Sequence, residues 1–165
     1  MTDLLNVNDL QVEFHVAEGV VRAVNGVSFR VPAGKTVALV GESGSGKSVV
    51  SQTIMGILPK AARVTGGEVI FTDPRNNSVT DLLTLETDGA RMREIRGGRI
   101  SIIFQEPMTS LSPLHTVGDQ ISEALFLHRD VSKQQGMELT AEMLGLVGFP
   151  DPVRALRTYP FELSG

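Results

Sequence analysis

The chain of 165 residues contains no cysteine. A chain without cysteine forms no disulfide, no zinc site with thiolate ligands and no iron–sulfur cluster. It also lacks any apolar run close to the roughly 18 residues that mark a membrane-spanning helix. Its first residues, Met1–Val7, include an acidic side chain and no apolar centre of a secretory signal. We therefore expect a soluble, cytoplasmic protein.

An excess of positive charge is missing as well. The chain has 15 Lys and Arg against 19 Asp and Glu, which gives a net charge of −4. This balance argues against nucleic acid, or an anionic membrane surface, as a partner held by bulk electrostatics. The apolar fraction of 41% and the charged fraction of 21% are typical of a globular protein. The length suits one domain with a sizeable core.

Glycine, in contrast, recurs at close spacing in one segment, Gly41-Glu42-Ser43-Gly44-Ser45-Gly46-Lys47-Ser48. The apolar residues 36–40 before it predict a short buried strand, and residues 47–58 after it predict a helix that stops at Pro59. A strand, a glycine-rich turn and a helix in this order are the setting that the P-loop pattern requires.

The residue types in this segment suit phosphate binding. Glycines at 41, 44 and 46 allow a backbone whose N–H groups turn inward around phosphate oxygens, at the positive end of the following helix. Lys47 can reach the β- and γ-phosphates, and the Ser48 hydroxyl can hold a magnesium ion. The predicted nucleotide-binding residues of this loop are Gly41, Ser43, Gly44, Ser45, Gly46, Lys47, Ser48 and Val49.

The rest of the chain divides into a β-rich part and a helical part. Patterns of alternation and apolar runs predict strands at Leu10–Val16, Val20–Val31 (one strand or a pair around Asn25-Gly26), Glu68–Phe71 and Arg99–Phe104. Helices are predicted at Leu82–Ile95, Val117–His128, Ser132–Val147 and Pro152–Arg157, with Ser132 as an N-cap and Gly148 as a stop. We expect a nucleotide-binding core with a β subdomain over about residues 1–112, and a helical subdomain over about residues 113–165.

Three further stretches resemble one family. Ile102–Leu111 resembles the Q-loop of ABC-transporter ATPases of the oligopeptide and dipeptide importer branch, Gly26–Val31 resembles the family's paired strands before the P-loop, and Tyr159–Gly165 resembles the opening of its signature motif. The likeness runs from Leu4 to the last residue. It implies an α/β P-loop NTPase fold of the ABC ATPase type, with an antiparallel β subdomain and a small helical subdomain, incomplete at the C-terminus.

The resemblance implies roles for residues outside the P-loop. Gln105 would sense the γ-phosphate and its water and would give its carbonyl oxygen to magnesium, chemistry that a neutral amide can perform; the alternative is an ordinary polar residue at a strand end. Phe14 would stack on adenine; the alternative is a core phenylalanine of an alternating strand. Leu163, Ser164 and Gly165 would open the signature.

The implied function is that of an ATPase subunit that binds ATP and Mg²⁺ and drives import of di- or oligopeptides from the cytoplasmic face of the bacterial inner membrane. Its implied partners are transmembrane permease subunits, a second ATPase subunit and, indirectly, an extracytoplasmic peptide-binding protein. Importers of nickel or glutathione use nearly the same ATPase and stay open.

Two rival functions also stay open, a P-loop kinase and a module that binds ATP without hydrolysing it. The chain ends inside the signature and lacks the family's Walker B strand, so we expect this piece to be inactive as an ATPase.

Overall fold

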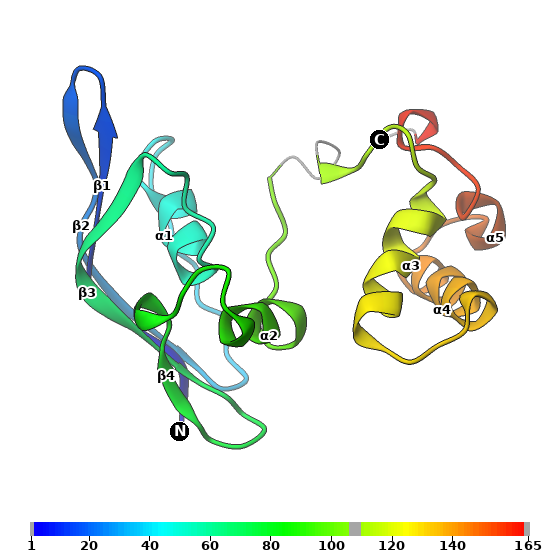
Figure 1. The fold of residues 1–165 in the computed structure, drawn as a ribbon, viewed down its shortest axis with the longest axis horizontal. Coiled ribbons are helices and arrows are strands. Elements are labelled where there is room, and N and C mark those ends of the chain that lie inside the picture. The colour runs from blue at the N-terminus through cyan, green and yellow to red at the C-terminus, as the bar shows by residue number, and fades with distance from the viewer. Residues whose placement is uncertain (1, 106–109, 164–165) are drawn as a thin grey trace. The chain divides into compact units, whose positions relative to one another are not determined.

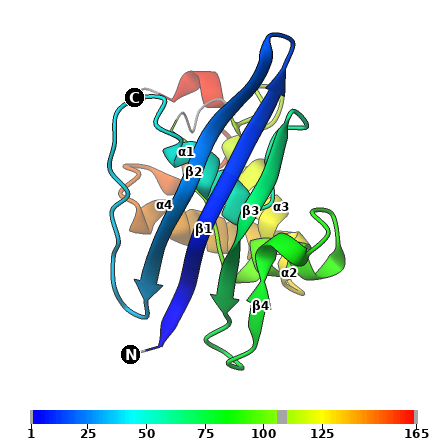
Figure 2. The ribbon, with the colours of Figure 1, turned by 90° about the vertical axis from the view of Figure 1, so that its left-hand side faces the viewer.

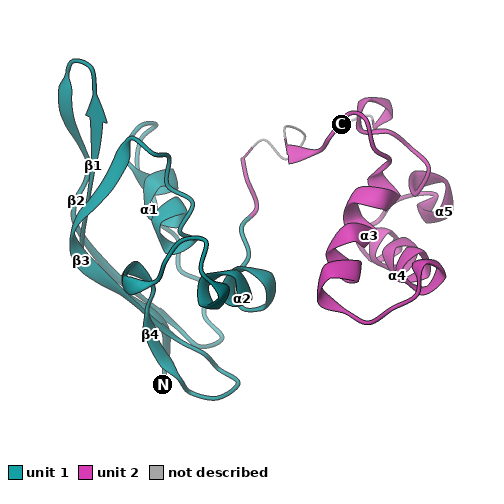
Figure 3. Cartoon of the chain, viewed as in Figure 1, with its two compact units in different colours: residues 1–102 teal, residues 103–165 magenta. Residues whose placement is uncertain are grey.

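In a computed structural model the structure describes residues 2–105 and 110–163. The chain divides into two compact units, residues 1–102 and residues 103–165 (Figure 3). No helix among the described residues is both long and apolar enough to cross a bilayer.

The first unit is built on one antiparallel sheet of four strands. The strands are β1 (Asp3–Val16), β2 (Gly19–Pro32), β3 (Ala62–Thr72) and β4 (Val79–Asp81). They lie in the order β2-β1-β3-β4, and each neighbouring pair is antiparallel (Figures 1 and 2). The antiparallel β subdomain expected from the sequence is therefore present.

A β-bulge in β1 sets which of its side chains enter the core. Val7 and Leu10 are both fully buried although they are three residues apart, whereas a regular strand would turn them to opposite faces. The extra residue is Asp9, whose φ of 46° breaks the strand, and the register shifts there against both β2 and β3. Opposite the bulge, a Cβ on Gly67 would lie 2.5 Å from the Asp9 carbonyl oxygen, so only glycine fits.

One face of the sheet carries the core of this unit. Helix α1 (Lys47–Ile54), the 3₁₀ helix η1 (Leu82–Thr84) and helix α2 (Ala90–Gly98) contribute residues to it. Figure 2 shows α1 behind the strands. The buried cluster consists of Val7, Leu10, Val12, Val24, Val50, Ala62, Val69, Phe71, Leu82 and Ile95.

A buried ion pair ties the β3–β4 hairpin to the end of α2. Asp73 is only 1% exposed, and one of its carboxylate oxygens accepts a hydrogen bond from Arg99 Nε at 2.7 Å. Its other oxygen accepts from the Arg75 backbone N–H at 2.9 Å. These hydrogen bonds, that with Arg99 first, hold the pKa of Asp73 below the ordinary range of an aspartate.

The second unit contains the helices α3 (Val117–His128), α4 (Lys133–Leu146) and α5 (Pro152–Ala155), with a final 3₁₀ turn η3 (Pro160–Glu162). The Ser132 hydroxyl accepts from the Gln135 N–H while the Gln135 side chain accepts from the Ser132 N–H, which completes a capping box at α4. The predicted helices at 117–128 and 132–147 are thus confirmed, and so is Ser132 as an N-cap.

Two predicted strands are wrong. Residues 36–40 and 99–104 form no strand, and Val40 and Ile103 are 86% and 92% exposed. A strand of a parallel sheet forms only beside neighbouring strands, and the described residues provide no backbone partner for residues 36–40 or 101–104. The sequence pattern indicated burial, but burial needs those neighbours.

Other boundaries moved for local reasons. The helix predicted at 82–95 is interrupted, because the Asp81 carboxylate caps η1 by accepting from Leu83 N at 3.0 Å and a turn closes from Gly89 N to Glu86 O at 2.9 Å. Helix α1 ends at Ile54, before the predicted stop at Pro59. Strand β2 is a single strand through Asn25-Gly26 rather than a pair.

Candidate functional site

The glycine-rich loop closes against strand β2. Gly46 is the N-cap of α1 with a φ of 89° in the left-handed region. A Cβ on Gly46 would clash with the Ala23 carbonyl oxygen and would lie 3.4 Å from Val24 Cγ2. Both the backbone conformation and the close approach therefore require glycine, and they fix where the loop enters the helix.

Lys47 folds back over the loop. Its Nζ donates to the carbonyl oxygens of Gly41 at 2.8 Å and Glu42 at 2.6 Å, and to Ser45 Oγ at 3.2 Å. The ammonium group thus lies above the loop backbone, where an anion held by the loop would meet it.

Several backbone N–H groups of the loop have no acceptor among the described residues. Ser45 N donates to Glu42 O at 3.2 Å and Val50 N donates to Gly46 O at 3.0 Å. Between and beside them, N–H groups without a hydrogen bond in the described part of the chain belong to Gly44, Gly46, Lys47, Ser48 and Val49. No acidic residue occupies the first turn of α1. This end of the helix offers donors and a positive dipole end to an anion.

Ser48 and Ser43 are both exposed. The Ser48 hydroxyl makes no hydrogen bond within residues 2–105 and 110–163, so its oxygen is open to a further partner. A magnesium ion carried by nucleotide phosphates accepts such an oxygen ligand. No group of three or more His, Asp or Glu among the described residues could hold a metal by itself.

Phe14 lies near the point where the loop meets the sheet. It is half-buried, packs against the core cluster, and pairs across the strands with Val21 of β2 and Ala62 of β3. Val21 is 55% exposed, and the loop contact Ala23 lies two residues further along β2. The ring has one side on the core, as the alternative reading expects, and its placement also suits adenine stacking, which stays a prediction.

Gln105 belongs to the second unit and is exposed. Its side chain makes no hydrogen bond within the described part of the chain. The rest of the predicted Q-loop, residues 106–109, lies outside the described residues, so the role of Gln105 also stays a prediction.

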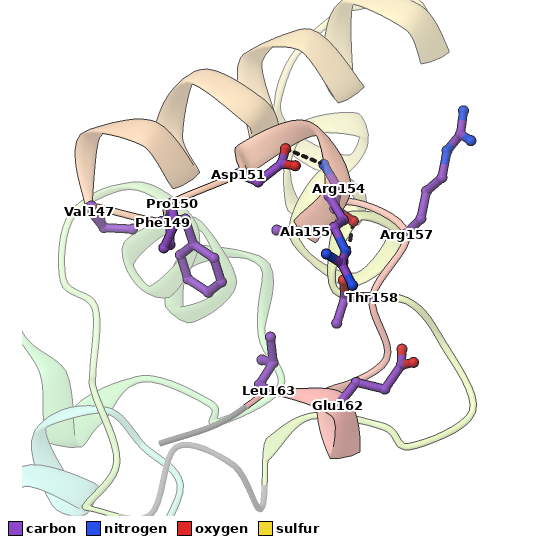
Figure 4. A pocket seen from close by; sticks show the side chains of 11 residues that line it. Val147, Phe149, Pro150, Asp151, Arg154, Ala155, Arg157, Thr158, Glu162 and Leu163 are labelled. Atoms are coloured by element: carbon purple, nitrogen blue, oxygen red, sulfur yellow. Dashed lines mark hydrogen bonds between the residues drawn. The ribbon is translucent and has the colours of Figure 1, made fainter.

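Of the predicted signature residues, Leu163 is described, whereas Ser164 and Gly165 lie outside the described residues. Leu163 is half-buried and lines an open cavity of about 740 Å³ in the second unit, together with Phe149, Arg154 and Thr158 (Figure 4). In Figure 4 the Leu163 side chain points into this space from the end of η3.

Two contacts of the loop could not be predicted from the sequence. The contact of Gly46 with Ala23 joins residues 23 positions apart and leaves no local signal. The bond from Lys47 Nζ to Ser45 Oγ joins residues two apart, and this spacing alone carries no strong expectation.

These features define a P-loop nucleotide-binding domain: an extended segment, then a glycine-rich loop with unpaired amides, then a helix that begins with a lysine and a serine. The family model described as ABC transporter matches residues 24–165. The chain belongs to the ABC transporter family.

Curated relatives cover nearly all of this chain. It is 50% identical over 98% of its length to a probable peptide ABC transporter ATP-binding protein, y4tR, of Sinorhizobium fredii, covering 46% of that protein. It is 48% identical to the dipeptide transport ATP-binding protein DppD of Bacillus subtilis, covering 100% of the chain and 47% of DppD. The chain therefore spans less than half the length of these relatives.

Solved structures share the fold. The ATP-binding cassette MJ0796, in a dimeric structure bound to ADP and Pi, matches with a TM-score of 0.78 and 23% identity over 97% of this chain and 63% of the cassette. CbiO1 from Clostridium perfringens matches with a TM-score of 0.68 and 20% identity, over 99% of this chain and 57% of CbiO1. At these identities the likeness concerns the fold, and it confirms the predicted α/β P-loop fold of the ABC ATPase type.

Proposed function

We propose that this chain binds ATP through the loop of residues 41–49. The observation that carries the proposal is the set of unpaired backbone N–H groups at the start of α1, in the same loop that the Lys47 ammonium group contacts. A triphosphate supplies anionic oxygens for these donors, and hydrogen bonds to a charged acceptor are roughly twice as strong as neutral ones.

Each predicted site residue has a part in this proposal. Lys47 contacts the β- and γ-phosphates, and Ser48 gives its oxygen to Mg²⁺, with Gln105 as a second oxygen ligand. Bound magnesium would neutralise part of the phosphate charge. Phe14 offers its partly exposed ring to adenine. Leu163, with Ser164 and Gly165, begins a signature that faces the nucleotide of a second ATPase subunit.

We further propose that the full-length protein hydrolyses ATP to power import of di- or oligopeptides across the bacterial inner membrane, as a peripheral subunit on its cytoplasmic face. The names of the similar proteins y4tR and DppD, which specify peptide and dipeptide transport, support peptides over nickel or glutathione. Its proposed partners are transmembrane permease subunits, a second ATPase subunit and, indirectly, a peptide-binding protein.

The test of ATP binding is a competition series with this chain. A fluorescent ATP analogue is displaced in turn by AMP, ADP, ATP and inorganic triphosphate in the presence of Mg²⁺. If the loop holds the β- and γ-phosphates, affinity rises from AMP to ADP to ATP, and triphosphate alone competes. Equal affinity for AMP and ATP would show that the loop does not hold those phosphates.

The test of import uses the full-length protein with its permease subunits in proteoliposomes. Uptake of a labelled dipeptide should require Mg-ATP on the side of the membrane where the ATPase subunit lies. Nickel and glutathione should not be taken up. Uptake of either of these in place of the dipeptide would replace the peptide assignment while leaving ATP binding intact.

A further inference from the structure

We propose that the Ser45 hydroxyl is a latch on Lys47, and that bound phosphate must displace it. The proposal rests on the proposed function, since it concerns how the same loop admits a nucleotide. It assigns to the Ser45 side chain a role distinct from that of its backbone.

All three N–H donors of the Lys47 ammonium group are in use. An ammonium group has three N–H donors and no acceptor. In the structure it has three acceptors, the carbonyl oxygens of Gly41 and Glu42 and the hydroxyl oxygen of Ser45. Every donor of Lys47 is therefore engaged, and a phosphate oxygen can receive one only if an existing acceptor gives it up.

The three acceptors of Lys47 differ in how easily they can release its N–H group. The two carbonyl bonds measure 2.6 and 2.8 Å, whereas the bond to Ser45 Oγ measures 3.2 Å and is the longest of the three. The carbonyl oxygens belong to the loop backbone and cannot turn away from Lys47 unless the loop moves. A hydroxyl leaves by rotation about one side-chain bond. Ser45 is therefore the acceptor that phosphate replaces.

The turn and the close approach of Gly41 hold Ser45 in place. Its backbone N–H donates to Glu42 O at 3.2 Å, which closes the turn. Across the loop, a Cβ on Gly41 would lie 2.6 Å from Ser45 Oγ. The hydroxyl thus occupies space that any other residue at position 41 would fill, and the latch depends on glycine there.

The direct test measures Lys47 without any nucleotide. The chain has four lysines, and the other three, Lys35, Lys60 and Lys133, are exposed and make no side-chain hydrogen bond among the described residues. Brief acetylation with acetic anhydride, read by mass spectrometry, gives the rate at Lys47 relative to these three. We expect Lys47 to react most slowly, and Ser45→Ala to raise its relative rate about two- to fivefold, as loss of one weak hydrogen bond would.

The matched control is Ser51→Ala. The Ser51 hydroxyl donates to Ser48 O within α1 at 2.9 Å and is not among the acceptors of Lys47. Removing it should leave the relative rate at Lys47 unchanged. Equal rates at Lys47 in the parent and in Ser45→Ala would overturn the latch, whether or not the chain binds nucleotide.

The second arm measures competition. In a titration with Mg-ATP, Ser45→Ala should bind about two- to fivefold more tightly than the parent, because one donor of Lys47 is already free. Unchanged or weaker binding alongside faster acetylation would overturn the displacement by phosphate. If the parent binds no Mg-ATP, the proposed function fails, and displacement by phosphate fails with it.

Discussion

At the scale of single residues, the Phe14 ring has two candidate roles, in the core of the first unit and in adenine binding. One side packs on the core cluster, and the sheet around it becomes exposed at Val16 of β1 and Val21 of β2. Removal of the ring has different consequences for a core residue and for a residue that stacks on adenine. Loss of core packing lowers the stability of the fold, whereas loss of stacking lowers the affinity of every adenine nucleotide.

Phe14→Leu separates these roles, because leucine keeps most of the apolar volume and loses the aromatic face. We expect ATP, ADP and AMP to bind more weakly by a common factor, equivalent to about 1 kcal/mol. Competition titrations of the three nucleotides measure this factor, and chemical denaturation monitors the fold. Weakening of ATP alone, or of none, would remove Phe14 from the adenine site.

At the scale of elements, the helices of the second unit were the best predicted. Their signals are local, such as Ser132 three residues before Gln135 and the Gly148 that follows α4. The predicted strands at 36–40 and 99–104 were wrong because a parallel strand depends on neighbours far along the chain. The bulge at Asp9 was equally invisible, since its partners lie far along the chain: Asp9 N donates to Ser28 Oγ at 2.8 Å, and Gly67 leaves room for the Asp9 carbonyl.

The candidate site shows the same division. The glycine spacing predicted the position of the loop and of Lys47, because each glycine answers a local backbone need. The closure of Gly46 against Ala23 and the engagement of Lys47 by its own loop could not be predicted, since they depend on how the loop folds back in space.

The ion pair between Asp73 and Arg99 joins the β3–β4 hairpin to the end of α2, and it yields a prediction with a defined pH dependence. Because the pKa of Asp73 is lower folded than unfolded, its contribution to stability is present above about pH 4, the ordinary aspartate value, and is lost as the pH falls through the folded value. Asp73→Asn should therefore lower the thermal midpoint at pH 7, and the difference from the parent should shrink near pH 3.

Thermal unfolding of the two proteins at both pH values measures this. Asp88→Asn serves as a control for a change of charge alone, since Asp88 forms no ion pair among the described residues. A midpoint difference for Asp73→Asn that is as large at pH 3 as at pH 7 would contradict the role of the ionised pair.

At the scale of the whole chain, apolar side chains are left uncovered. Val37, Leu39 and Val40 before the loop, and Ile103 and Phe104 before Gln105, are all exposed. Apolar surface left in water forgoes about 25 cal/mol of stabilisation per Å², against a total stability of only about 5–15 kcal/mol. We predict that the 165-residue chain is either marginally stable or self-associates through residues 36–40.

Size-exclusion chromatography with light scattering, and thermal unfolding, test this prediction. Substitution of Val40 by threonine, which keeps the β-branched shape, should reduce the association. A stable monomer would contradict the prediction.

The measurement that bears most directly on the central claim is a calorimetric titration of Mg-ATP into the parent chain and into Lys47→Ala. Lys47 is the cation of residues 41–49, and it folds back onto the carbonyl oxygens of Gly41 and Glu42, so its removal should weaken ATP binding by about 2–4 kcal/mol. Circular dichroism confirms that the variant keeps its fold. The account predicts measurable binding by the parent and a loss of at least about thirtyfold in the variant; affinities within threefold of each other would contradict it.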